Sequence, residues 1–201
     1  FPAESLVYIP NFVSVPEAPP GIEEGDYFLF AGRLAPEKGI ATLIRAAGRS
    51  GQKLVIAGTG EEEQALRRLA EAEGAAVQFA GYLSGEPLTR LMAAAKALVL
   101  PSEWYENAPV SVLEAYGLGR PVIGTSIGGI PELIRPGETG LVAGPSDPDD
   151  LARALAEMAA LTPDQRATMG AAGRDWVRRD FSPDLHRERL LDLYQSLGVM
   201  A

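Results

Sequence analysis

Short segments that are apolar throughout alternate along this chain with segments whose apolar residues recur at helical spacing. The apolar segments are residues 27–31, 53–57, 77–80, 97–100, 121–124 and 140–143. Strands without a polar face must be covered on both sides, which is the arrangement of a parallel sheet between two layers of helices. The sequence therefore predicts a Rossmann-like, doubly wound α/β fold.

The remaining segments with helical spacing lie between these strands and after the last of them. They are residues 40–49, 61–73, 87–95, 108–118, 149–161, 163–178 and 183–197, with a short helical turn at residues 131–134. No strand pattern follows residue 147, so the sheet is expected to precede a helical C-terminal tail. We predict one domain over residues 21–201 that includes this tail.

The first 20 residues contain five prolines and one short apolar run, at residues 6–9. Proline-rich stretches favour extended backbone, so we predict an edge strand followed by a linker in residues 1–20. The chain does not begin with Met. We expect it to be a piece of a longer protein.

Composition argues against several classes of function. The formal net charge of −9 is unlike the basic surface that nucleic acids require. The absence of Cys excludes disulfides and thiolate sites, and we interpret the one histidine, His186, as a solvated helix residue. The sequence therefore predicts no metal site. No apolar run approaches the ~18 residues of a membrane span, and the first residues do not form a signal peptide.

Two carboxylates flank the predicted start of the helix at residues 108–118. Glu106 lies just before that start, and Glu114 is expected in the second turn. Because unpaired N–H groups at a helix start favour an anion, a ligand with a phosphate between two hydroxyl-bearing ends would fit, as in a nucleotide-sugar. The alternative is a loop charge and a solvated helix residue. A lone acid in a segment nearly free of charge, residues 108–119, favours a paired or ligand-facing Glu114.

Two cations lie on the glycine-bounded loop after the first central strand, at residues 32–39. Arg33 offers a planar fork for phosphate oxygens, and Lys38 offers a mobile point charge. A solvated basic pair, partly neutralised by Glu37, is the alternative that remains open.

The other loops after strands carry weaker signals. Gly58 and Gly60 suggest a dinucleotide fingerprint, but its third glycine is replaced by Glu63. The three carboxylates at residues 61–63 would cap the helix dipole, so a structural turn is favoured over a phosphate role. The loops at residues 81–84 and 128–132 are also explained by turns that lead into helices.

Six motifs in a fixed order carry a specific resemblance. They are G-R-x4-K-G at residues 32–39, A-G-T-G at 57–60, G-Y-L at 81–83, P-S-x3-E-x7-E-A at 101–115, G-R-P-V-I at 119–123 and G-G-I-P-E at 128–132. Together they resemble the C-terminal, donor-binding domain of the retaining glycosyltransferases of GT-B architecture, in glycosyltransferase family 4 (glycosyl transferases group 1). The resemblance covers essentially all 201 residues.

The resemblance implies roles for individual residues. Arg33 and Lys38 would bind the donor diphosphate and stabilise its charge as the glycosidic bond breaks. Glu106 would contact the hydroxyls of the transferred sugar near the reacting carbon, so these three residues are the expected catalytic group. Glu114 would accept hydrogen bonds from the ribose. The rest of the expected donor site is Gly32, Tyr82, Leu83, Asn107, Ala108, Val110 and Ser111.

One departure from the family pattern affects this site. Many members have Phe-Gly after the first Glu, where this chain has Asn107, Ala108 and Pro109. Proline has no N–H, so a backbone donor is either missing or supplied by Val110 or Ser111.

The resemblance also implies what this chain works with. The donor would be a UDP-, GDP- or ADP-hexose, and neither a metal nor another cofactor is expected. A missing N-terminal domain would carry the acceptor site. Nucleic acid is not expected as a partner. We expect a cytoplasmic location, and whether the missing domain associates with a membrane is left open. The alternatives are a GT-B nucleotide-sugar epimerase and a non-catalytic nucleotide-sugar-binding module.

Overall fold

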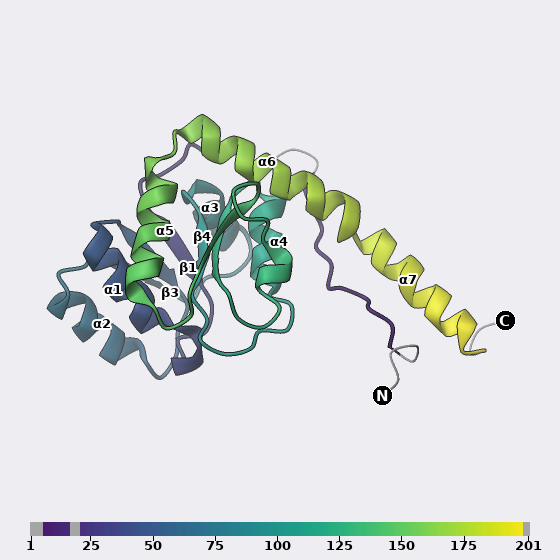
Figure 1. The fold of residues 1–201 in the computed structure, drawn as a ribbon, viewed down its shortest axis with the longest axis horizontal. Coiled ribbons are helices and arrows are strands. Elements are labelled where there is room, and N and C mark those ends of the chain that lie inside the picture. The colour runs from purple at the N-terminus through teal and green to yellow at the C-terminus, as the bar shows by residue number, and fades with distance from the viewer. Residues whose placement is uncertain (1–5, 17–20, 199–201) are drawn as a thin grey trace.

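The computed structural model describes residues 6–16 and 21–198, and its centre is a six-stranded parallel sheet (Figure 1). The strands are β1 (Phe28–Ala31), β2 (Leu54–Ala57), β3 (Val77–Gly81), β4 (Leu98–Leu100), β5 (Val122–Thr125) and β6 (Gly140–Ala143). Their order across the sheet is β3-β2-β1-β4-β5-β6, and every neighbouring pair is parallel. The predicted doubly wound α/β fold is confirmed.

The helices follow the predicted pattern, with ends that differ by a few residues. They are α1 (Ile40–Ser50), α2 (Glu63–Ala72), α3 (Glu86–Ala94), α4 (Val110–Gly117), α5 (Pro148–Ala160), α6 (Pro163–Asp180) and α7 (Pro183–Ser196). The described residues also include two short 3-10 helices, η2 (Pro36–Lys38) and η3 (Pro131–Leu133). The sequence analysis did not predict η2.

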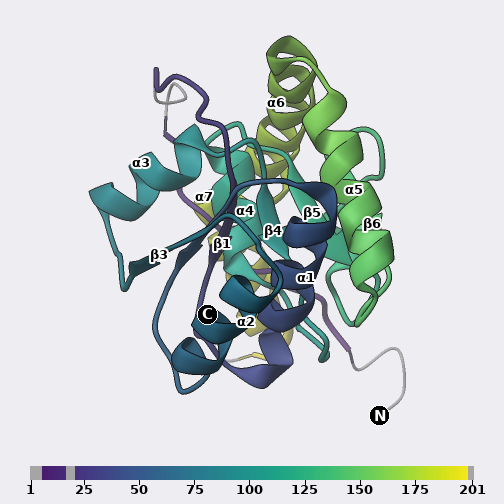
Figure 2. The same cartoon turned by 90° about the vertical axis from the view of Figure 1, so that its left-hand side faces the viewer.

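Helices lie on either side of the sheet, so most residues of every strand except the edge strand β3 are buried (Figure 2). In β1, Phe28 and Phe30 join the apolar core formed with α1, α2 and α5. Leu29 points to the opposite core, formed with α3, α4 and the end of α6. Successive side chains of a strand alternate between faces, so a strand covered on both sides, such as β1, is apolar on both.

The predicted edge strand at residues 6–9 is wrong. Residues 6–16 have no regular secondary structure, and they run beside the last two helices instead of pairing with the sheet (Figure 1). The Val13 N–H donates to the Phe181 carbonyl at 3.0 Å, and His186 Nδ1 lies 2.8 Å from the Pro10 carbonyl oxygen. Residues 1–5 and 17–20 of the predicted linker lie outside the described residues.

Two predicted helix starts are too early by two residues. Pro109 has an extended backbone (φ −67°, ψ 112°) and is the N-cap of α4, which begins at Val110. Of the three glutamates at residues 61–63, only Glu63 lies within α2, and none caps the helix through its side chain. Glu63 instead accepts a hydrogen bond of 2.8 Å from Arg67. The prediction that all three carboxylates lie in the first turn is therefore wrong: Glu62 is the N-cap, and Glu63 alone is in that turn.

The order of strands places the topological switch point between β1 and β4, where the chain leaves the two strands in opposite directions. The loops that follow these strands touch there. The Glu103 N–H donates to the Glu37 carbonyl at 2.9 Å. A Cβ on Gly39, whose φ is +66°, would lie 1.9 Å from the Pro101 carbonyl oxygen. Only glycine permits this approach, which brings the two loops together.

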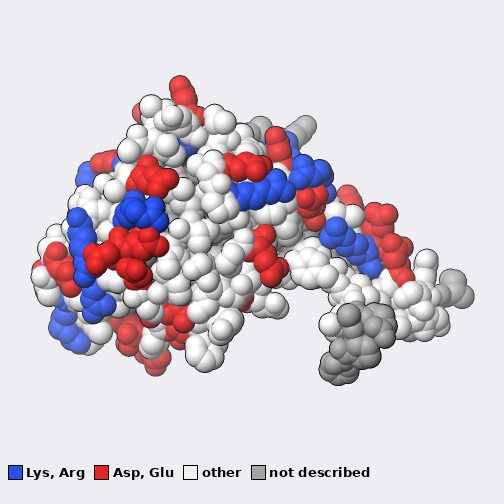
Figure 3. Space-filling model, in the orientation of Figure 1, with Lys and Arg blue, Asp and Glu red and all other residues white. Residues whose placement is uncertain are grey.

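Basic and acidic side chains are interspersed on the face shown in Figure 3. This differs from the continuous basic surface that is typical of nucleic-acid binding. Of the helices within the described residues, none combines the length and the apolar character that crossing a lipid bilayer requires.

Candidate functional site

A cavity of about 490 Å³ lies at the carboxyl ends of β1, β2 and β3, next to α3 and α4. We call it the central cavity. It is lined by Ala31, Gly32, Arg33, Ala57, Gly58, Thr59, Gly60, Tyr82, Leu83, Leu88, Met92, Ser111 and Glu114. It therefore brings together six of the residues predicted to bind the donor, which come from loops far apart in the sequence.

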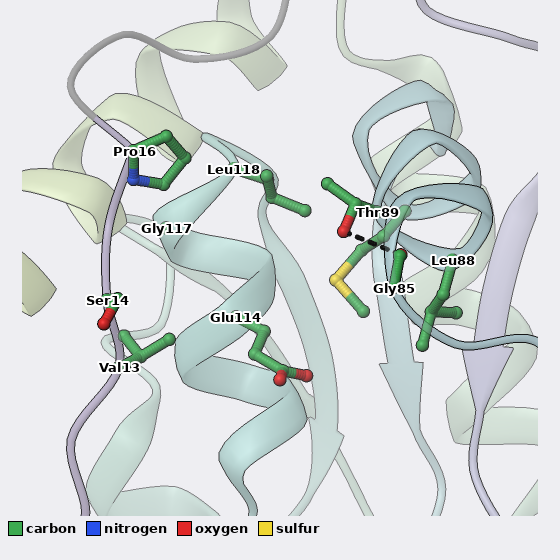
Figure 4. Close-up of a pocket in the computed structure, with 10 residues that line it drawn as sticks. Val13, Ser14, Pro16, Gly85, Leu88, Thr89, Glu114, Gly117 and Leu118 are labelled. Atoms are coloured by element: carbon green, nitrogen blue, oxygen red, sulfur yellow. Dashed lines mark hydrogen bonds between the residues drawn. The ribbon is translucent and has the colours of Figure 1, made fainter.

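Glu114 lies in the second turn of α4, as predicted, and its side chain points toward the space between α4 and α3 (Figure 4). A second cavity, of about 400 Å³, shares Glu114, Leu88 and Met92 with the central cavity. The surrounding protein raises the pKa of the Glu114 carboxyl because it removes water from the charged form. Glu114 is exposed and makes no ion pair with any described residue, so the paired alternative is wrong, and both a ligand-facing and a solvated carboxylate are compatible with the structure.

Glu106, Asn107 and Ala108 line a different cavity, of about 670 Å³, on the other side of the start of α4. The loop with Gly128 and Gly129 forms part of its wall. The Gly129 N–H donates to the Glu106 carbonyl at 2.7 Å, and a Cβ on Gly129 would lie 2.1 Å from the Asn107 carbonyl oxygen. The sequence analysis assigned this loop to turn structure alone, whereas it also supports the backbone of Glu106.

Lys38 lines neither cavity, but it makes an ion pair with Glu106 at 2.6 Å between Nζ and Oε1. About a quarter of each side chain is exposed, 24% for Lys38 and 21% for Glu106. The fully buried Ser102 donates a hydrogen bond of 2.9 Å to the same carboxylate oxygen. The sequence analysis quoted Ser102 within a motif but gave it no role, although its place just after an apolar strand was a signal for a residue at the carboxyl ends of the strands.

Arg33 lines the central cavity and makes an ion pair with Glu37. The Arg33 side chain is 69% exposed, so this pair is largely solvated. The partial neutralisation by Glu37 that the sequence left open is therefore present. It does not remove Arg33 from the cavity, because an exposed pair of this kind contributes little free energy and exchanges readily for another anion.

The start of α4 lies beside the central cavity. Val110 and Ser111 are the first two helical residues, and their N–H groups have no acceptor within the helix. None of the described side chains caps this helix start. Ser111 lines the central cavity, whereas Val110 lines none of the cavities described here. The missing N–H of Pro109 thus lies outside the helix, and Ser111 is the better placed of the two predicted replacements.

The A-G-T-G loop has the structural role that was predicted for it. A Cβ on Gly58 would lie 1.8 Å from the Gly32 carbonyl oxygen, and one on Gly60 would lie 2.1 Å from that of Leu34. Only glycines allow the loop to lie this close to its neighbour. The same loop also lines the central cavity, which its sequence did not indicate.

Within the described residues, no group of three or more His, Asp or Glu side chains could hold a metal ion. His186 is not the fully solvated residue that was expected. Its ring packs against Phe12 with a centroid distance of 4.6 Å, and this contact helps to hold the N-terminal segment beside α7.

The family described as "Glycosyl transferases group 1" matches residues 17–176. The GDP-mannose-dependent monoacylated alpha-(1-6)-phosphatidylinositol monomannoside mannosyltransferase of Corynebacterium glutamicum is 38% identical, over 82% of this chain and 45% of that protein.

Solved structures show the same fold. Sucrose-phosphate synthase from Thermosynechococcus elongatus has a TM-score of 0.80 at 30% identity, over 87% of this chain and 46% of that one. Anabaena HepE, solved with UDP-glucose, has a TM-score of 0.75 at 23% identity, over 87% and 49%. The latter likeness is one of fold alone.

The family match covers most of the chain, and its range includes all six motifs that the sequence analysis identified. The chain spans about half the length of the relatives described above. This chain belongs to the glycosyl transferases group 1 family.

Proposed function

We propose that this chain binds the nucleotide-sugar donor of a hexosyltransferase that retains the configuration of the transferred sugar. One observation carries the proposal. Around the start of α4, the fold gathers Arg33, the Lys38–Glu106 pair and the unpaired carboxylate of Glu114, all at the switch point of the sheet. The name of the Corynebacterium glutamicum relative supports a nucleotide-sugar donor.

In this proposal the central cavity holds the nucleoside. Tyr82 and Leu83 lie against the base, and Glu114 accepts hydrogen bonds from the ribose hydroxyls. The diphosphate lies between Arg33, Lys38 and the N–H of Ser111. The hexose extends past the start of α4 to Glu106, where it meets the cavity that Asn107 and Ala108 line.

The chemistry that fits this placement begins with cleavage of the bond between the anomeric carbon and the diphosphate oxygen. The bonding electron pair leaves with the diphosphate, and Arg33 and Lys38 stabilise the added charge. An acceptor hydroxyl then bonds to the anomeric carbon from the same face, and its proton passes to the departing phosphate. In this proposal the acceptor site belongs to a further, N-terminal domain, and the whole protein is cytoplasmic.

We also propose that no divalent metal is needed for donor binding. In many nucleotide sites a metal balances the diphosphate charge. Here two side-chain cations and the N–H groups at a helix start supply that balance.

Titration calorimetry in the presence of EDTA tests the function. UDP, GDP and ADP are titrated into the chain, followed by UDP-glucose, GDP-mannose and ADP-glucose. We expect the nucleoside diphosphate of one of the three bases, and its sugar conjugate, to bind measurably without metal. The proposal would be contradicted if none of the six ligands gave heat of binding and none changed the melting temperature of the chain.

Two variants then test the orientation of the donor. Glu114→Gln should weaken binding of the free nucleoside diphosphate and of its hexose conjugate by a similar factor, about tenfold, because both contain the ribose. Glu106→Gln should weaken binding of the hexose conjugate alone. Equal losses for both ligands in both variants would show that the donor is not oriented as proposed.

A further inference from the structure

We propose that Ser102 is a positioning residue that holds the Glu106 carboxylate toward the donor sugar when Lys38 turns to the diphosphate. This inference rests on the proposed function. It concerns a residue that lies in the P-S-x3-E-x7-E-A motif and to which the sequence analysis assigned no role.

The first observation is that two hydrogen-bond donors, Lys38 and Ser102, share one oxygen of the Glu106 carboxylate. Lys38 Nζ lies 2.6 Å from Oε1, and Ser102 Oγ donates to the same atom at 2.9 Å. The second oxygen, Oε2, accepts no hydrogen bond from the described residues. A carboxylate held through one oxygen offers the other to a hydroxyl group, and hydroxyl groups are what a hexose presents.

The second observation is that these two hydrogen-bond donors differ in charge and in burial. A diphosphate carries more negative charge than a carboxylate, so it competes for Lys38, which has a flexible stem and is 24% exposed. Ser102 is neutral and 0% exposed, so a diphosphate neither attracts it nor reaches it. When Lys38 changes partner, the hydroxyl of Ser102 is the donor that stays on Glu106.

The third observation is that Ser102 is itself anchored to the sheet. Thr125, at the end of β5 and 1% exposed, donates a hydrogen bond of 2.7 Å from Oγ1 to the Ser102 carbonyl. The backbone of Glu106 is fixed separately, through the N–H of Gly129. A chain of hydrogen bonds therefore runs from a rigid strand end to the sugar-facing carboxylate, which is how sites keep a reacting group in place.

A purely structural Ser102 would behave differently. Its hydroxyl would stabilise the loop, and its removal would lower stability without distinguishing between ligands. A positioning Ser102 acts only on the part of the ligand that Glu106 contacts. The two roles separate when a nucleoside diphosphate and its hexose conjugate are compared on the same variant.

The first experiment measures both dissociation constants by calorimetry for the wild-type chain, Ser102→Ala and Thr139→Val. The ligands are the pairs GDP and GDP-mannose, and UDP and UDP-glucose. Thr139 is the matched control, because it is another 0% exposed hydroxyl and hydrogen-bonds to Tyr116 at 2.9 Å. Ser102→Ala should bind the hexose conjugate about tenfold more weakly and the free diphosphate within about twofold of wild type. Thr139→Val should alter neither. Equal losses for both ligands in Ser102→Ala would overturn the inference.

The second experiment needs no ligand. Crystal structures of Lys38→Ala and of Lys38→Ala with Ser102→Ala are compared. Glu106 should keep its position in the single variant and lose it in the double variant. A displaced Glu106 in the single variant, or an unmoved one in the double variant, would overturn the role of Ser102. If the wild-type chain binds none of the nucleotides, the proposed function fails, whereas these structures still decide whether Ser102 positions Glu106.

Discussion

Arg33 and Lys38 lie on the same loop and are both positively charged, but their ion pairs differ in exposure to solvent. Arg33 and Glu37 are 69% and 36% exposed, whereas Lys38 and Glu106 are 24% and 21% exposed. An exposed pair contributes little and is screened by salt. A pair that is mostly removed from water leaves a costly unpaired charge when one partner is taken away.

This difference predicts distinct effects for two substitutions. Arg33→Ala should weaken nucleoside-diphosphate binding about tenfold to a hundredfold, because it removes charge-assisted hydrogen bonds at little cost to the fold. Lys38→Ala should weaken binding less and lower the melting temperature more, since it leaves Glu106 without its cation. Calorimetry and thermal unfolding measure the two effects.

A control for these variants is Arg153→Ala on α5, which removes an exposed cation that pairs with Asp150 and Glu157. It should change neither binding nor the melting temperature by a measurable amount. Unchanged nucleotide affinity in Arg33→Ala would mean that the diphosphate does not lie against Arg33.

At the scale of elements, the site depends on how closely the β1–α1 loop approaches the β4–α4 loop. Gly39 makes this approach possible, because its φ is +66° and a Cβ would lie 1.9 Å from the Pro101 carbonyl oxygen. Lys38 precedes Gly39, and Glu106 lies in the loop that begins at Pro101. Separation of the two loops would therefore pull the Lys38–Glu106 pair apart.

Gly39→Ala should lower the free energy of unfolding by about 2–4 kcal/mol and abolish measurable nucleotide binding, because it combines backbone strain with a steric clash. Gly51 is a matched control, since its φ is also +66° and nothing lies within 4 Å of a Cβ placed there. Gly51→Ala should cost only about 1 kcal/mol and leave binding intact. Urea unfolding and calorimetry compare the two. Equal losses of stability would show that the approach of the loops is not tight.

At the scale of the whole molecule, a buried cluster of charges joins regions far apart in the sequence. Glu24 accepts hydrogen bonds from Arg166 Nε at 3.0 Å and from Arg120 Nη1 at 3.0 Å. The exposed fractions of these side chains are 14% for Glu24, 5% for Arg166 and 14% for Arg120. Burial lowers the pKa of Arg120, which Glu24 partly offsets. This cluster connects the segment before β1 to α6 and to the turn after α4.

Glu24→Gln should lower the free energy of unfolding by about 3–5 kcal/mol, because it leaves two guanidinium groups without a counter-charge inside the protein. Nucleotide affinity should stay unchanged, since the cluster lies outside the cavities of the site. Urea unfolding at pH 7 measures the loss.

Asp26→Asn is the control for this substitution. Asp26 pairs with Lys53 and Lys96, and hydrogen bonds from these lysines lower its pKa to about 2, but its side chain is 66% exposed. Because its pKa is lowered, any stabilisation from Asp26 is present at pH 7 and is lost as the pH falls from about 4 to about 2. At pH 7, Asp26→Asn should cost far less than Glu24→Gln. A similar loss in both would mean that burial does not set the strength of these pairs.

The sequence alone determined the strands, most of the helices and the family. Fully apolar strands such as residues 54–57 require cover on both faces, and this local pattern is enough to predict a parallel sheet. The order of the motifs also predicts the roles of Arg33, Glu106 and Glu114 in the site. Helix ends were less accurate, because at α2 and α4 the choice between turn and helix depends on neighbouring loops.

Only the tertiary structure decided which side chains meet. The contacts of Lys38 with Glu106, of Gly129 with the Glu106 backbone and of Glu24 with Arg166 join residues separated by 68, 23 and 142 positions. The run at residues 6–9 looks like a strand by composition, yet it lies beside α7 and pairs with no strand of the sheet. Local patterns specify which faces must be buried, whereas partners are chosen by strand order and loop packing, which no local pattern contains.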